Sequence, residues 1–231
     1  MLSLDNTVLS IDKARATPTG QARARSRRPS DHVTRNLLDA AAVEFAAHGF
    51  AGASTRRIAE RAGAHQPQIN YHFTSKEQLW RATVDHLFSL MDADLPGLGD
   101  GPSTDAAFAA VVRGFLRFSA DRPELDRIIN LEATAPSARL DWLVATHLRP
   151  RFAAVSAGWA ALRAAGLGAD LTASEAWEVL TSFGAMHFAN APMLTLLGIH
   201  GGDGRTEADA HAERILGILM PTARRGPPAP D

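Results

Sequence analysis

Polar side chains with the chemistry to read nucleic-acid bases gather in one short stretch of the chain, Ser54–Gln78. Within it, Ile69 and Phe73 are four residues apart, which places both on one face of a helix. The opposite face then carries amide and imidazole groups, from Gln66, Gln68, Asn70 and His72. Glutamine and asparagine can form paired hydrogen bonds with adenine edges, so this pattern indicates a surface that reads DNA bases.

Two short helices joined by a glycine-containing turn are expected to position these side chains. Ser54 and Thr55 are typical of a helix start, because a hydroxyl can accept hydrogen bonds from the first backbone N–H groups. Gly63 ends this helix, since glycine adopts a left-handed conformation without strain. Pro67 fits the first turn of a second helix over about 66–73. This order is typical of helix-turn-helix modules, whose second helix enters the major groove.

An ordinary helical corner with a solvated polar face would show the same pattern, but this stretch also carries a dense set of characteristic residues. Their spacing between Gly49 and Lys76 contains no gap. They resemble the tetracycline-repressor (TetR) family of bacterial transcription regulators at Phe45, Gly49, Thr55, Ile58, Ala59, Ala62, Gly63, the segment Ile69–Phe73, Lys76 and Leu79. The specific resemblance covers residues 34 to about 81.

The resemblance implies an all-α fold, with an N-terminal three-helix helix-turn-helix domain and a C-terminal helical domain for ligand binding and dimerisation. It also implies a homodimer held by two C-terminal helices from each subunit, and a ligand pocket among the central helices. We therefore expect a sequence-specific transcription regulator that a small-molecule effector releases from a palindromic operator. A repressor is the preferred reading, because a protein bound near a promoter blocks polymerase; activation stays open.

The start of the second helix is expected to read bases, because that end enters the groove most deeply in this type of module. Gln66, Pro67 and Gln68 occupy it. Arg56 matches a position that can reach a base in relatives, where it could bind guanine with two hydrogen bonds; a phosphate contact is the alternative. Asn70 departs from the family, in which many members have an aromatic residue, and it suggests hydrogen bonding instead of stacking.

A second set of residues is expected to hold phosphates. Thr55 lies at a helix start, where its hydroxyl and nearby N–H groups suit an anion. Tyr71, His72 and Lys76 resemble the phosphate clamp of the family, although capping or packing within the module would also explain His72. Four arginines precede the first helix and form either a DNA-contacting arm or a solvated tail: Arg23, Arg25, Arg27 and Arg28.

Composition and charge fit this interpretation. The 231 residues are 45% hydrophobic and contain no cysteine, which excludes disulfides, zinc–thiolate sites and thiol catalysis. Residues 1–91 hold 12 basic against 8 acidic side chains, and residues 92–231 hold 12 against 17. A basic module on an acidic body suits DNA binding, although random partition of charge would also produce it. The chain shows neither a signal peptide nor a run of about 18 apolar residues, so we expect a cytoplasmic protein.

Helical periodicity continues through the chain, without the alternation typical of strands. Pro150 is expected to kink one long helix, and capping boxes at 121–124 and 172–175 mark two helix starts. We expect four regions: a disordered basic tail (1–30), a helix-turn-helix DNA-binding domain (31–80), a helical effector-binding and dimerisation domain (81–220) and a disordered tail (221–231). The expected helices span about 34–48 (with Leu38, Ala41, Ala42 and Phe45 buried), 54–62, 66–73, 75–94, 104–120, 121–133, 138–165, 172–191, and one from Thr206 after a loop at 201–205.

The helix over 172–191 carries two apolar stripes, and either could meet a second subunit. The residues assigned to the dimer interface are Trp177, Leu180, Gly184, Phe188, Ala191, Ile215, Leu216 and Leu219. The ligand pocket is assigned to aromatic, sulfur-containing and polar residues of the central helices, most of which could equally form plain core. These are Phe115, Phe118, Trp142, His147, Phe152, Phe183, Met186, His187 and Asn190.

Two other functions compete with a ligand-responsive regulator. An enzyme is disfavoured, because no nucleophile–base pair, metal-binding spacing or phosphate-binding loop occurs in the sequence. The sequence accordingly implies no cofactor and no metal. An architectural DNA-binding protein without an effector is the other alternative; it would show weak sequence preference and no ligand-dependent release. The expected partners are operator DNA, a small-molecule effector and a second copy of the chain.

Overall fold

A computed structural model describes residues 29–95, 105–199 and 204–221. These residues form helices and no strand, which confirms the all-α prediction. The predicted N-terminal arm with its arginines, most of the C-terminal tail, the break at 96–102 and most of the loop at 201–205 lie outside the described residues. None of the described helices is both long enough and apolar enough to cross a membrane.

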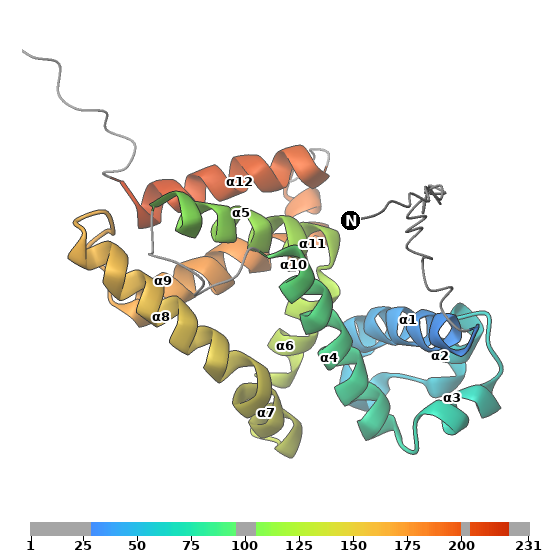
Figure 1. The fold of residues 1–231 in the computed structure, drawn as a ribbon. Helices are drawn as coiled ribbons and strands as arrows, with labels where there is room; N and C mark the ends of the chain where they lie inside the picture. Colours follow the sequence, from blue (N-terminus) through green and yellow to red (C-terminus); the bar gives the residue numbers. More distant parts are fainter. Residues whose placement is uncertain (1–28, 96–104, 200–203, 222–231) are drawn as a thin grey trace, which may run out of the picture.

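The N-terminal helices are α1 (Pro29–Gly52), α2 (Thr55–Arg61), α3 (Gln66–His72) and α4 (Lys76–Asp94). The body contains α5 (Asp105–Asp121), α6 (Glu124–Glu132), α7 (Ala138–Leu143), the π-helical turn η1 (Val144–Leu148), α8 (Arg149–Ala164), α9 (Ala173–Glu178), the π-helical turn η2 (Val179–Ala185), α10 (Met186–Ala189), α11 (Ala191–Leu196) and α12 (Gly204–Leu219). Figure 1 shows α4 leading from the blue N-terminal helices into the rest of the molecule.

Local signals act at several ends of the N-terminal helices as predicted, but α1 begins at Pro29 and not at about residue 34, so its first residues fall in the region predicted to be disordered, and it continues to Gly52. Gly49 and Gly63 both have a φ of 64°, a left-handed conformation that interrupts α1 and follows α2. The Ser54 hydroxyl accepts a hydrogen bond from the Arg57 N–H at the start of α2, and the Ser75 hydroxyl accepts one from the Gln78 N–H at the start of α4. The buried face of α1 includes Leu37, which was not predicted, and leaves Leu38 only half-buried.

Predictions in the body were less accurate. Pro150 falls at the start of α8, where the π-helical turn η1 precedes it and the Arg149 N–H donates to the Val144 carbonyl. The wide turn accommodates a residue that cannot donate a backbone hydrogen bond. The predicted helix 172–191 begins with the expected Thr172–Glu175 capping box but divides into α9, η2, α10 and α11. The capping box at 121–124 was wrong, because Asp121 ends α5 and Pro123 precedes α6 without a side-chain cap. The last helix begins at Gly204, within the expected loop.

Two buried clusters hold the helices together. The first joins α1–α4 to α6 and α7, and includes Phe45, Ile58, Trp80, Leu125 and Leu143. The second cluster joins α5, α8, α9, η2, α10 and α12. Its buried side chains include Leu116, Trp159, Leu180, Phe188 and Ile215. The first cluster contains residues on both sides of residue 80, so it does not mark a domain boundary there. The predicted domain boundary at residue 80 stays a prediction.

A buried carboxylate fixes the link between α1 and α2. Glu44 is 3% exposed, and its Oε1 accepts hydrogen bonds from the Ser54 N–H at 2.8 Å and from Arg57 Nε at 2.7 Å. Arg57 also donates to the Gly52 carbonyl at 3.1 Å. Burial works to raise the pKa of Glu44, but the hydrogen bonds from Arg57 and Ser54 and the positive charge of Arg57 outweigh it, so the pKa is lowered. This network positions α2 against α1.

Replacing Glu44 with glutamine should lower the free energy of unfolding by about 1–3 kcal/mol near neutral pH, because the variant loses a charge-assisted bond. Since the folded-state pKa of Glu44 lies below the ordinary value of 4.5, its stabilisation is present above pH 4.5 and is lost as the pH falls through the folded-state pKa. The difference between the two proteins should therefore shrink in acid. Urea titrations across this pH range measure both effects.

Glu60→Gln is the matched control. Glu60 pairs with Arg56 at 2.9 Å, but both side chains are exposed, so its loss should change stability by less than about 1 kcal/mol. Equal losses in the two variants would contradict a special role for Glu44.

Candidate nucleic-acid interface and central cavity

Helix α3 presents most of the predicted base-reading residues to solvent. Ile69 and Phe73 are buried under the helix, and Gln66, Pro67 and Asn70 are exposed on it. Gln68 is half-buried, and its Oε1 accepts a hydrogen bond from the His65 N–H at 2.8 Å. This bond stabilises the start of α3 and leaves the NH2 group of the Gln68 amide as a donor. The predicted polar face is therefore present, with one member also acting as a cap.

Tyr71 and His72 differ in their surroundings. Tyr71 is 86% exposed, and its ring meets that of His72 edge-on, with 5.1 Å between centroids. His72 is half-buried, and its Nδ1 lies 3.4 Å from Thr34 Oγ1 of α1. The geometry around His72 fits the packing alternative, whereas an exposed phenol on the outer helix fits a DNA contact.

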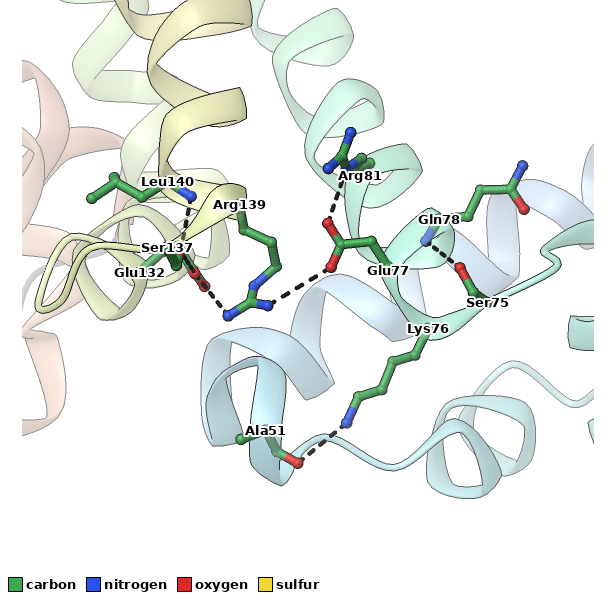
Figure 2. Close-up of polar contacts among 10 residues, drawn as sticks. All are labelled: Ala51, Ser75, Lys76, Glu77, Gln78, Arg81, Glu132, Ser137, Arg139 and Leu140. Carbon is green, nitrogen blue, oxygen red and sulfur yellow. Dashed lines mark hydrogen bonds and ion pairs between the residues drawn. The ribbon is translucent and has the colours of Figure 1, made fainter.

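Lys76 contacts the end of α1, as Figure 2 shows. Its Nζ donates to the Ala51 carbonyl at 3.2 Å and lies 5.0 Å from the centroid of the Phe50 ring. An ammonium group has three donors, so this contact leaves capacity for a phosphate. At the start of α2, Thr55 is half-buried, and Arg56 is exposed and paired with Glu60 at 2.9 Å.

An arginine of the body is fixed against the N-terminal helices. Arg139 of α7 lies with its guanidinium carbon 3.9 Å from the centroid of the Phe50 ring. Figure 2 shows Arg139 between Glu132 of α6 and Glu77 of α4, at 2.9 Å and 3.7 Å. Glu77 also accepts from Arg81 at 3.0 Å. This network, which the sequence did not indicate, connects the body to the end of α1 and to the start of α4.

A cavity of about 260 Å³ lies between the second half of α4 and the helices of the body. Of the nine predicted ligand-binding residues, Phe115 and Met186 line it. Helix α4 contributes residues that were not predicted, namely Phe88, Met91, Asp92 and Leu95. The remaining lining residues are Phe108, Val111, Val112, Leu125, Asp126, Ile129, Asn130, Ala133, Leu148, Arg151, Val155, Trp177, Leu180, Thr181 and Ser182.

Three other predicted pocket residues pack elsewhere and do not line this cavity. Phe118 is buried in the first cluster. Trp142 meets the rings of Trp80 and His147 edge-on, with 5.7 Å and 5.3 Å between centroids. His147 stacks on Phe88, and its Nε2 lies 2.8 Å from Oδ1 of Asp85. Burial lowers the pKa of His147, and the hydrogen bond and negative charge of Asp85 oppose this effect. The contacts of His147 with Phe88 and Asp85 pack η1 against α4.

The last four predicted pocket residues also lie outside the lining. Phe152 packs edge-on against Trp177, with 5.6 Å between ring centroids. His187 pairs with Glu207 of α12 at 2.9 Å. Phe183 is 54% exposed, and Asn190 is exposed. Periodicity placed these residues on the correct helices but could not show which way each helix faces.

The predicted dimer-interface residues lie mostly in the interior of this chain. Six of them are buried within one protomer: Leu180, Gly184, Phe188, Ile215, Leu216 and Leu219. A Cβ added at Gly184 would lie 3.0 Å from Leu116 of α5, so the small residue admits a neighbouring helix of the same chain. Trp177 lines the cavity, and Ala191 is half-buried. The exposed apolar side chains of this region are Phe183, Met193, Leu196, Leu197, Ile199 and Ile218.

Residues 37–83 match the model of the bacterial regulatory proteins of the tetR family. The chain is 31% identical over 99 residues to the HTH-type transcriptional regulator RutR of Escherichia coli strain K12, an alignment that covers 43% of this chain and 47% of RutR. It is 30% identical over 133 residues to the HTH-type transcriptional activator FasR of Mycolicibacterium smegmatis, covering 56% of this chain and 61% of FasR. The chain thus spans about half the length of these curated relatives.

Similarity of fold extends further along the chain. The crystal structure of AibR, in complex with isovaleryl coenzyme A and operator DNA, superposes with a TM-score of 0.66 at 17% identity and covers 82% of this chain and 98% of AibR. At that identity the likeness concerns the fold. The matched residues include α2, the turn at Gly63 and α3, whose outer face is polar. By this match and by the identity to RutR and FasR, the helix-turn-helix part of this chain belongs to the tetR family of bacterial regulatory proteins.

Proposed function

We propose that this chain is a transcription regulator that binds a palindromic operator as a homodimer and leaves it when a small molecule occupies the central cavity. The observation that carries the proposal is the exposed polar face of α3, held in place by buried Ile69 and Phe73. Amide side chains on that face have the donors and acceptors to read base edges in the major groove. The membership of the tetR family supports this reading.

A homodimer follows from the size of the reading surface. One short helix contacts only a few base pairs, so useful affinity requires two copies on related half-sites. The exposed apolar side chains of η2, α11 and α12 offer a surface for the second copy, notably Phe183, Leu196 and Ile218. This surface replaces the buried residues that sequence periodicity suggested.

Effector release is proposed from the position of α4. Its first turn carries Lys76 beside Ala51 of the DNA-binding module, and its last turns carry Phe88, Met91 and Asp92 in the cavity wall. A ligand that fits the cavity better in one position of α4 would shift the population toward that position. The AibR structure, which contains both isovaleryl coenzyme A and operator DNA, supports the presence of a small-molecule site and a DNA site in one protein of this fold. Regulation of chromosomal DNA would take place in the cytoplasm.

Selection of binding sites from random DNA tests the proposal directly. We expect two inverted half-sites whose centres are about one helical turn or a multiple of it apart. Reporter expression from the selected operator then distinguishes repression, which we propose, from activation. Recovery of no preferred sequence would instead favour an architectural DNA-binding protein, and an operator without inverted repeats would contradict the dimeric mode.

Gln68→Ala should change sequence preference. Loss of a paired contact with an adenine should reduce discrimination at one position of each half-site by about 1–3 kcal/mol, which quantitative binding to a panel of single-base operator variants would show. Gln68 also caps α3, so its replacement could act through the helix as well as through DNA. Gln66→Ala removes a neighbouring amide that does not make this capping bond. Thermal unfolding checks that both variants are folded. Unchanged preference in a folded Gln68→Ala protein would remove this residue from the reading surface.

Lys76→Ala should weaken binding by a similar factor for all operator variants. Loss of one phosphate contact should reduce the slope of log K against log salt concentration by about 0.9 for each subunit. Lys76→Arg is the matched control, because it keeps the charge and should keep the slope. If alanine altered the preferred sequence and left the slope unchanged, the phosphate role would be wrong.

A further inference from the structure

One carboxylate in the cavity wall has an oxygen that no charged side chain and no well-formed hydrogen bond satisfies among the described residues; the Ser119 hydroxyl is a polar neighbour of the group. Asp126 of α6 lines the cavity, and its Oδ2 is buried without a hydrogen bond. Most of the surrounding lining is hydrocarbon, including Phe88, Phe115, Ile129 and Met186. A buried polar atom of this kind is costly unless something binds to it. The position of Asp126 therefore indicates the chemistry of a ligand that would suit this cavity.

Among the described lining residues, the arginine Arg151 is paired with a different carboxylate, and no contact joins it to Asp126. Nη2 of Arg151 donates to both carboxylate oxygens of Asp92, at 2.7 Å and 2.6 Å, and Nη1 donates to the His147 carbonyl at 3.0 Å. Its guanidinium carbon also lies 4.3 Å from the centroid of the Phe88 ring. Asp92 and Arg151 offset each other, which leaves Asp126 as the unbalanced acid.

No other charged side chain lines the cavity within the described residues. The side chains that α5, α9, η2 and α10 contribute to the cavity wall are uncharged: they are aromatic, aliphatic, sulfur-containing or hydroxyl-bearing. Burial raises the pKa of Asp126 to about 6, against a smaller lowering by the nearby Ser119 hydroxyl. A raised pKa means that the surrounding side chains stabilise the carboxylate poorly, and a positive charge placed beside it would relieve that cost.

We propose that the cavity binds a small, largely apolar molecule that carries a protonated amine, with an ammonium N–H donating to the carboxylate of Asp126. The hydrocarbon part of the ligand packs against the aromatic lining. A volume of about 260 Å³ lies just below the usual range of small-molecule pockets, about 300–1,000 Å³, and suits an amine of modest size. This assignment rests on the proposed function in taking the cavity as the effector site, and it adds the chemical class of the effector.

Three probes with one skeleton separate charge from shape: 4-phenylbutylamine, 4-phenylbutan-1-ol and 4-phenylbutanoate. Calorimetric titration of the full chain without DNA, at about pH 7.5, should show the amine binding about tenfold or more tightly than the alcohol, because its hydrogen bond to a carboxylate is charge-assisted. The carboxylate should bind most weakly, because the cavity already holds an unbalanced acid. Equal or tighter binding of the alcohol or the carboxylate would overturn the proposal, and so would failure of the amine to bind.

Asp126→Asn keeps the shape of the side chain and removes its charge. It should abolish the preference for the amine, while thermal unfolding shows that the variant remains folded. Asp121→Asn, at an exposed position at the end of α5 and outside the lining, should keep the full preference. An amine preference that survives in Asp126→Asn would overturn the proposal.

Lowering the pH gives an independent readout. The carboxylate becomes protonated as the pH falls through about 6, so the affinity for the amine should fall by about tenfold per pH unit below that value, while the affinity for the alcohol stays constant. An affinity for the amine that is flat across this range would count against Asp126 as its partner.

Parallel mobility-shift assays with the selected operator keep this inference separate from the proposed function. Amine binding through Asp126 without DNA release would uphold the inference and contradict the effector role of the cavity. Release of DNA by the alcohol as readily as by the amine would uphold the effector role and overturn the inference.

Discussion

The apolar side of α4 is the contact on which both halves of the molecule depend. Leu79, Trp80 and Val84 are buried against the helices that carry the DNA-binding face, and Phe88 and Met91 reach the cavity wall. A continuous helix transmits displacement along its axis because its backbone hydrogen bonds make it stiff. Because the same helix packs against the DNA-binding helices and forms part of the cavity wall, a displacement of α4 at one of these sites would alter the packing at the other.

Much of the N-terminal module could be predicted because its signals are local. A serine before α2, a glycine after it and a proline in the first turn of α3 each act on neighbouring backbone groups. Such effects do not require knowledge of the remaining chain. The polar outer face of α3 followed from the same reasoning, since burial of Ile69 and Phe73 leaves one orientation for the helix.

The body was harder because its helices are apolar on more than one side. For the segment after Thr172, two stripes compete for the interior, and only the packing of α5 and α12 decides between them. The π-helical turn η2 adds to the difficulty, since a wider turn shifts all later side chains around the axis. The cavity-lining residues of α4 were missed for a related reason: their apolar pattern is the same whether they face a core or a space.

Tyr71 is the only tyrosine in the chain, and it stands almost fully exposed on the outer helix. The protein therefore contains a spectroscopic reporter at the surface proposed to meet DNA. A fluorotyrosine incorporated in its place would give one fluorine resonance in magnetic resonance spectra, free of overlap from other sites. Its chemical shift would report events at α3, because no other site in the protein would carry fluorine.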